Sequence, residues 1–243
     1  MTTRTELSVL FALAIAGCGG GDSGDPHGGD AAPDADAGPP GPGTDYLFDL
    51  TRLHHFEVEL AAADWQWLQE NAVLEEYRPA TLVFEGRRYQ QAAIRFKGDY
   101  GSLYSCFEGE TRICPKLSIK VSVNTYDRDQ RFFGVRKLNF NSSVRDPSLM
   151  HEVVGYRLFR DMGVPAPRAS HATLTVNGEH QGLFVLVEEV DKEFLQDHFA
   201  DDEGNLYKSV WPQHDGPEPY LEALHTNEEE GDVSDMLAFH DMV

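Results

Sequence analysis

The sequence predicts an α+β domain in which an antiparallel sheet packs against helices, and three observations predict it. Residues 117–123 alternate apolar and polar side chains, as half-buried strands do. Asp146-Pro147 combines an N-cap residue with proline at the first helical position, and Gly163 ends the apolar period that follows. Asn177-Gly178 lies between two apolar runs, which is the signal of a β-hairpin.

In the N-terminal part of the domain we expect strands joined by turns, with one short helix. The expected strands cover residues 47–60, 81–84, 91–96, 117–123 and 137–140. Asp64 is expected to cap a helix that runs to Glu70, because its carboxylate can accept hydrogen bonds from the first turn. Glu85-Gly86 is the expected turn between the second and third strands.

In the C-terminal part we expect helices after Asp146, Asp191 and Ser234, and strands at residues 173–176, 182–187 and 204–210. The last helix carries an apolar face made of Met236, Leu237, Phe239 and Met242. No later element of the sequence would cover that face. We therefore expect the domain to be C-terminally truncated and this face to be an aggregation liability.

Composition limits the class of protein. The chain has 243 residues, of which 41% are hydrophobic and 11% aromatic, so it can form a sizeable core. Its formal net charge is −21, and no basic stripe offsets it. This balance argues against a nucleic-acid partner and suits an acidic, soluble surface.

The N-terminus has the pattern of an export signal. Arg4 precedes an apolar run that is too short to span a bilayer and that ends in Ile15-Ala16-Gly17-Cys18. This ending resembles the lipobox of bacterial lipoproteins, so we expect a signal peptide at residues 1–18 and a lipid on Cys18. Gly19 would favour the outer membrane. An ordinary secretory signal, with Cys18 lost or idle, is the alternative.

The next segment, residues 19–44, is rich in Gly, Asp, Pro and Ala and has almost no large apolar side chain. Such a segment cannot bury enough surface to offset its ordering entropy, so we expect a disordered linker. The folded domain is then expected at residues 45–243. Two cysteines remain in it, Cys106 and Cys114, and in an exported protein their close spacing suggests one disulfide. The alternative is a pair of metal-binding thiols.

The order of several motifs resembles the CotH kinase family, atypical protein kinases first met in spore coats. The matching stretches are IRFKG from Ile94, PKLSIKV from Pro115, RFFGVRKLNFN from Arg131, DPSLMHEVVGYRLFRDMGVPAPRAS from Asp146, VNGEHQGLFVLVEEVDKEFL from Val176 and GNLYK from Gly204. The resemblance implies a kinase-like fold that binds ATP and a divalent metal, Mg or Mn. It also implies phosphorylation of Ser or Thr on secreted or surface proteins.

The residues can be matched to that chemistry, which needs a cation on the phosphates. Lys116 and Lys120 lie four apart in an expected strand, so their side chains should share a face, beside a loop that contains Gly98 and Gly101. Both lysines are candidates for phosphate contact, and Lys97 is a third. The alternative is that they are solvated surface residues.

Carboxylates supply the other candidates. Glu152, in the first turns of a helix, is the best candidate to orient a phosphate-binding lysine; otherwise it is a favourable acid near a helix N-terminus. The resemblance implies that Glu188, Glu189 and Val190 form the linker that presents backbone groups to adenine. Lys208 either reaches the site or lies on the surface.

The catalytic aspartates of the family are expected beyond the helix that begins at Ser234, in an Asn/Tyr-rich segment and a Trp-Asp motif that this sequence lacks. The histidines show no HExxH spacing, and no GxSxG motif is present. Two hypotheses follow. The chain is a CotH-type kinase represented without its catalytic half, or it is a non-catalytic surface lipoprotein that uses the module for binding or structure.

Overall fold

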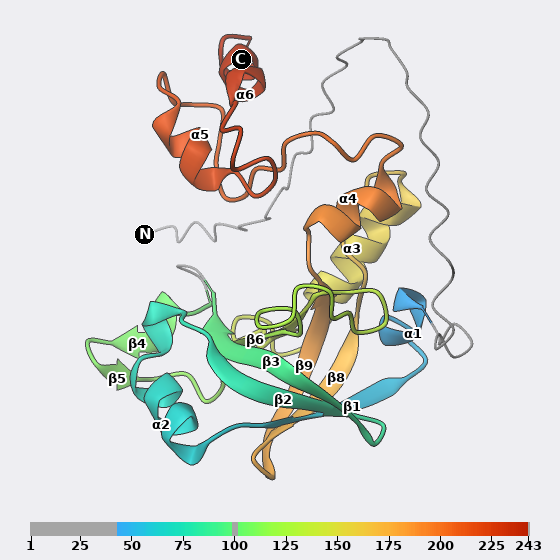
Figure 1. Cartoon of the computed structure of the whole chain (residues 1–243), viewed down its shortest axis with the longest axis vertical. Helices are drawn as coiled ribbons and strands as arrows, with labels where there is room; N and C mark the ends of the chain where they lie inside the picture. The colour runs from blue at the N-terminus through green and yellow to red at the C-terminus, as the bar shows by residue number, and fades with distance from the viewer. Residues whose placement is uncertain (1–42, 99–101, 243) are drawn as a thin grey trace, which may run out of the picture. The chain divides into compact units, whose positions relative to one another are not determined.

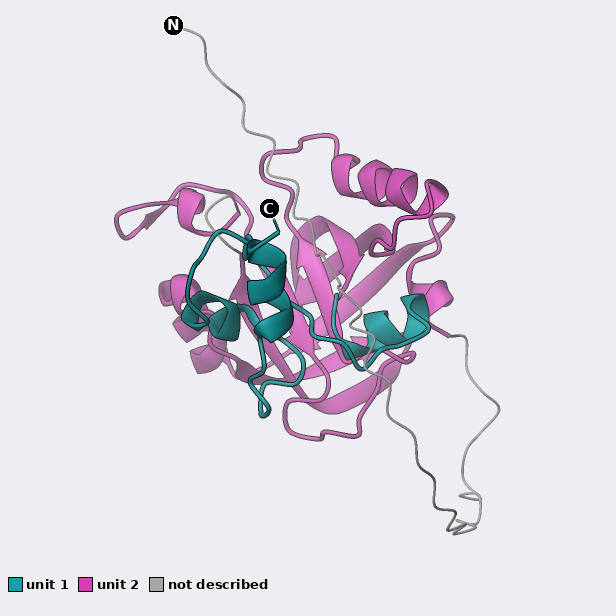
Figure 2. Cartoon of the chain, turned by 90° about the horizontal axis from the view of Figure 1, so that it is seen from above, with its two compact units in different colours: residues 1–34, 190–243 teal, residues 35–189 magenta. Residues whose placement is uncertain are grey.

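The computed structural model describes residues 43–98 and 102–242, which divide into two compact units (Figure 2). We call the unit drawn in magenta, which ends at Glu189, the first unit, and the unit drawn in teal, which continues from Val190, the second unit. The expected signal peptide, Cys18 and nearly all of the expected linker lie outside the described residues, as does Gly101. Within the described ranges, no helix is long and apolar enough to cross a membrane.

The first unit is built on a closed barrel with the strand order β1-β2-β3-β6-β7-β9-β8 (Figure 1). The strands are β1 (Leu53–Glu59), β2 (Arg78–Phe84), β3 (Arg87–Lys97), β6 (Ser118–Ser122), β7 (Lys137–Asn141), β8 (Ala169–Val176) and β9 (Glu179–Glu188). Neighbouring strands are antiparallel, except that β1 and β8 pair in parallel and close the barrel. Together with the helices, this confirms the predicted α+β class.

Shorter elements surround the barrel: α1 (Thr44–Leu47), α2 (Ala62–Glu70), the 3-10 turns η1 (Ala72–Leu74) and η2 (Tyr104–Cys106), the small hairpin β4 (Phe107–Glu108) and β5 (Thr111–Arg112), and α3 (His151–Asp161). Because successive side chains of a strand point to opposite faces, every second side chain of each barrel strand points inward and joins a continuous apolar core. Closely packed aromatic rings fill it, among them Phe56, Phe84, Phe132 and Phe140. Helix α3 packs Val153 against Val185 and Val187 on the outer face of β9.

Both predicted hairpin turns are present. Val176 pairs with Glu179 and Phe84 pairs with Arg87, so each turn has two central residues. Asn177-Gly178 and Glu85-Gly86 all have positive φ, the conformation that matches the twist of two antiparallel strands. The predicted disulfide is also confirmed, with 2.11 Å between the sulfur atoms of Cys106 and Cys114.

Helix α3 begins later than the sequence predicts. It starts at His151 because Leu149 adopts a positive φ of 57°, which interrupts any helix from Pro147. The N-cap residue is Met150 and not the predicted Asp146, although Oδ2 of Asp146 accepts a hydrogen bond of 2.8 Å from the His151 N–H. Leu47 lies in α1 and not in the predicted strand at residues 47–60, which is confined to β1.

The second unit contains α4 (Lys192–His198), α5 (Glu218–Ala223) and α6 (Ser234–His240). The strand expected at residues 204–210 is reduced to a bridge between Tyr207 and Leu224. The prediction of an uncovered apolar face on the last helix is wrong for most of that face. Met236 is buried against Tyr207 and Tyr220, with Leu237 and Phe239 packed on the same cluster, because α5 folds back to cover them.

Candidate functional site

A polar patch lies on the outer face of three neighbouring strands of the barrel. In β3, β6 and β7 the apolar residues point to the core, so the residues that alternate with them, Lys97, Lys120, Asn139 and Asn141, point to the other face. The register places Lys120 beside Asn139, and Lys97 beside Ser118. Strand pairing therefore gathers residues that are far apart in the sequence.

Lys97 is held by two asparagines of β7. Its Nζ donates hydrogen bonds of 3.1 Å to Oδ1 of Asn139 and 3.2 Å to Oδ1 of Asn141. Each asparagine also donates a hydrogen bond from its amide nitrogen to a carboxylate. Nδ2 of Asn141 donates to Glu152 on α3 at 2.7 Å, and Nδ2 of Asn139 donates to Glu189 at 2.8 Å.

Lys120 forms an ion pair with the same Glu189, at 2.8 Å between Nζ and Oε2. The two side chains are 12% and 10% exposed, so the pair is largely removed from water. We call these six residues the lysine cluster: Lys97, Lys120, Asn139, Asn141, Glu152 and Glu189. It contains two ammonium groups and two carboxylates, linked by two amides.

The surroundings shift the pKa of two members of the lysine cluster. Burial and, to a smaller extent, the ammonium of Lys120 lower the pKa of Lys97 to about 8, against the opposing effects of Glu189 and Glu152. Burial raises the pKa of Glu152, against the hydrogen bond that it accepts from Asn141. A lysine held in this way is a partly desolvated cation, and such a cation binds anions more strongly than one in water.

A third cation lies next to the cluster. Arg95 is the cross-strand partner of Lys120, and it forms an ion pair with Glu75. Its guanidinium lies 5.2 Å from the centre of the Tyr77 ring, and burial raises the pKa of that tyrosine. Three cationic side chains are thus concentrated on two adjacent strands of a chain whose net charge is strongly negative.

The structure separates the two lysines that the sequence places on one face. Strand β6 begins at Ser118, so the alternation does not extend back to Lys116. The Lys116 ammonium bonds the Leu183 carbonyl and lies 4.3 Å from the Phe184 ring, whereas Lys120 contacts Glu189. Leu183 and Glu189 are about 20 Å apart along an extended chain. The expectation of a shared face is therefore wrong.

Gly98 ends β3 directly after Lys97, with a φ of 149°. A Cβ atom there would lie 2.6 Å from Ser102 Oγ and 2.7 Å from Leu103 Cβ. Glycine is thus required by the close packing of the loop that follows. Its predicted contact with a nucleotide stays a prediction.

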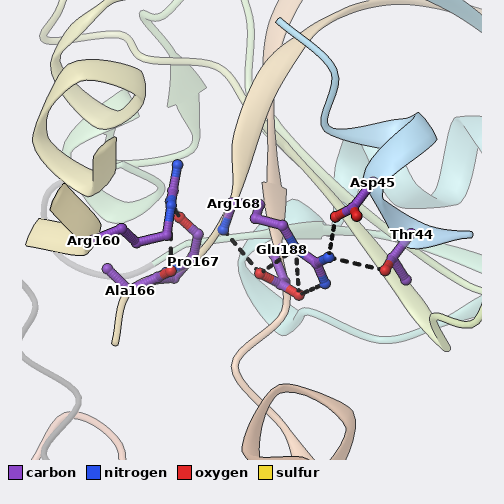
Figure 3. A network of polar contacts seen from close by, with 7 residues as sticks. All are labelled: Thr44, Asp45, Arg160, Ala166, Pro167, Arg168 and Glu188. Carbon is purple, nitrogen blue, oxygen red and sulfur yellow. Dashed lines mark hydrogen bonds and ion pairs between the residues drawn. The ribbon is translucent and has the colours of Figure 1, made fainter. Parts of the chain in front are cut away.

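Glu188 and Glu189 point to opposite sides of the strand end. Glu188 is bonded to Arg168, both through the guanidinium and through the backbone N–H at 2.8 Å. Arg168 in turn holds Thr44 and Asp45 of α1 at 2.9 and 2.8 Å (Figure 3). We call this the Arg168 clamp. It gives Glu188 a structural contact that the sequence did not indicate.

The remaining predicted residues lie in the second unit. Val190 packs against Phe194, Leu195 and Leu206 in an apolar cluster. The backbone N–H of Lys208 donates a hydrogen bond of 2.9 Å to the Ala223 carbonyl.

The sequence prediction did not include Asn139 and Asn141, although the alternation of Lys137–Asn141 already places both on the face opposite Leu138 and Phe140.

Binding of a metal ion needs several carboxylate, imidazole or thiolate ligands at one place. In the part of the chain that the structure describes, no three His, Cys, Asp or Glu side chains form such a group. The lysine cluster itself offers two ammonium groups and two carboxylates.

These features define an α+β barrel protein with a partly buried lysine and carboxylate site on its outer face. The chain belongs to the CotH kinase protein family, whose model matches residues 94–243. It is 30% identical over 71 residues to inner spore coat protein H of Bacillus subtilis (strain 168). These 71 residues are 29% of this chain and 20% of that protein. It is 40% identical over 57 residues to an inner spore coat protein H-like protein of the same organism, or 24% and 19% of the two chains. The matches span about a fifth of each relative.

Proposed function

We propose that the first unit is the nucleotide-binding part of an exported CotH-type protein kinase and that the lysine cluster binds the phosphates of ATP. The observation that carries the proposal is the position of Lys97 between Glu152 and Glu189, bridged to each by an asparagine. The chain's family membership supports the same conclusion. The acceptor would be Ser or Thr of a secreted or surface protein.

The roles of the cluster follow from its contacts. Lys97 and Lys120 supply positive charge for the phosphates, since phosphoryl groups are bound mainly by cations and N–H donors. Glu152 orients Lys97 through Asn141 and does not pair with it directly. When bound, a divalent metal would neutralise charge on the transferred phosphoryl group. Within residues 43–98 and 102–242, no three His, Cys, Asp or Glu side chains form a group that could hold that metal.

A second candidate function is a non-catalytic surface protein in which the lysine cluster only stabilises the barrel. Its support is the balance of charge within the cluster, because the ammonium groups of Lys97 and Lys120 face two carboxylates. A site that is already neutral can be structural. Binding measurements separate the two functions.

The test is calorimetric titration of the purified protein with ATP, with and without Mg²⁺, for the native sequence and two variants. Lys97→Met is expected to weaken ATP binding at least about ten-fold, because it removes a partly desolvated cation. Lys116→Met is the matched control: it removes the same charge at a lysine that contacts Leu183, far from Glu189. Equal affinities in all three proteins, or no ATP binding at all, would favour the structural alternative.

We also propose that the protein is exported and anchored by lipid on Cys18, as the sequence pattern suggests. Growth of an expressing bacterium with a radiolabelled fatty acid is expected to label the native protein and not a Cys18→Ser variant. Label in both proteins, or in neither, would contradict the anchor.

A further inference from the structure

Glu189 already contacts the ammonium group of Lys120 that an anionic ligand of the lysine cluster would use. Its Oε2 atom is 2.8 Å from Nζ of Lys120, and it accepts a hydrogen bond of 2.8 Å from Nδ2 of Asn139. The same carboxylate acts on Lys97, whose pKa it raises against the effect of burial. A phosphate that approached both lysines would therefore compete with this carboxylate.

The other charged groups around the lysines are arranged differently. Arg95 is paired with Glu75, from the turn after α2. Glu152 is linked to Lys97 through the amide of Asn141. Glu189 instead contacts a lysine of the cluster directly. It directly follows the last residue of β9, where a single side chain can turn without breaking a strand pair.

We propose that Glu189 is a specificity-determining residue, whose carboxylate competes for Lys120 so that an extended polyphosphate binds the lysine cluster and a single phosphate group does not. The proposal rests on the proposed function, since it assumes that the cluster binds phosphates. An orthophosphate ion has to replace an ion pair that is already formed and hydrogen bonded, so its gain is small. A triphosphate can contact Lys97 and Lys120 together and brings more charge than the carboxylate it displaces. Selectivity then arises as a difference between two affinities.

The test uses the variant Glu189→Gln. Glutamine keeps the shape of the side chain and a carbonyl oxygen that can still accept the hydrogen bond from Asn139, so the variant removes charge with little loss of packing. The matched control is Glu179→Gln, which changes the net charge equally at an exposed position near the start of the same strand. Binding of sodium orthophosphate and of sodium tripolyphosphate is measured by calorimetry at one fixed ionic strength, because surface charge effects depend on salt.

We expect the native protein and Glu179→Gln to bind tripolyphosphate and to bind orthophosphate much more weakly. In Glu189→Gln we expect orthophosphate affinity to rise at least about ten-fold more than tripolyphosphate affinity. Adding Lys120→Met to Glu189→Gln is expected to remove that gain. An unchanged ratio of the two affinities in a folded Glu189→Gln protein overturns the role of Glu189 and leaves the proposed function intact. Failure of all proteins to bind either anion overturns both.

Discussion

Glu188 and Glu189 are adjacent in the sequence, yet they belong to two regions of different design. Glu188, with its side chain 5% exposed, is held in the Arg168 clamp by a guanidinium and a backbone N–H. Glu189 contacts Lys120 and an asparagine in the lysine cluster. The clamp ties α1 to the end of β9, whereas the cluster gathers like charges on adjacent strands.

The Arg168 clamp has the contacts of a structural charge pair, whereas the lysine cluster is the candidate binding site. In the clamp, one carboxylate and one guanidinium form several hydrogen bonds, which is the arrangement that offsets the cost of burying charge. In the lysine cluster, Lys97 is held only by neutral amide acceptors among its hydrogen bonds, and burial depresses its pKa. The two regions thus hold their buried cations in different ways: Arg168 by a carboxylate and Lys97 by amides.

The largest effect on stability is expected in the clamp. Arg168→Met leaves the Glu188 carboxylate buried without its guanidinium, which should lower the free energy of unfolding by about 3–5 kcal/mol. Urea unfolding at neutral pH measures the loss. The control is Arg157→Met, which breaks the exposed pair with Asp161 and should cost less than about 1 kcal/mol. Similar losses in the two variants would show that the clamp is not a structural centre.

The disulfide is expected to have the next largest effect. Cys106 and Cys114 close a loop with a sequence separation of eight residues, and Cys106 is fully buried. Replacing both by serine should lower the free energy of unfolding by about 2–3 kcal/mol through loop entropy. ATP affinity should stay within about two-fold, since neither cysteine belongs to the lysine cluster. A larger change in affinity would extend the binding site to this loop.

The smallest effect on stability is expected from Lys97→Met, and it depends on pH. Because the pKa of Lys97 is lowered to about 8, the folded state holds fewer protons than the unfolded state between pH 8 and 10.5. The cost of burying the charged Lys97 side chain is therefore complete below pH 8 and falls as the pH rises and the lysine loses its proton. The free energy of unfolding of the native protein should thus rise with pH relative to that of Lys97→Met.

The measurement is the difference in unfolding free energy between the two proteins from pH 7 to pH 9. The charged groups that act on Lys97 are Lys120, Arg95, Glu152 and Glu189. A difference that does not change with pH would mean that Lys97 is not desolvated. ATP affinity of the native protein should fall several-fold over the same window as Lys97 loses its proton.

Local signals in the sequence predicted most of the barrel. Asn177, Gly178 and Gly86 are residues that tolerate the positive φ of a two-residue turn, and alternation located the strands that these turns connect. Helix α3 was predicted with a start that is too early and with Asp146 as its N-cap, whereas the N-cap residue is Met150. The reason is the left-handed conformation of Leu149, which no local preference indicates.

The candidate site was predicted only in part. Glu152 and Lys120 lie in the cluster, but Lys116 does not, since the strand begins two residues after it. Alternation of side chains puts Lys116 and Lys120 on one face only if the strand includes both, and β6 begins at Ser118. Asn139 and Asn141 were overlooked because neutral amides carry no charge signal, although they connect Lys97 to both carboxylates.

The sequence by itself determined which residues face the core, where the hairpins turn and which two cysteines are bonded, because these depend on neighbours in the chain. It also carried the motifs of the CotH kinase protein family. Only the tertiary structure decided that Glu189 contacts Lys120 while Glu188 contacts Arg168, and that Lys97 lies beside Asn139. These contacts depend on the register between strands and on barrel closure, which join residues that no short segment of sequence brings together.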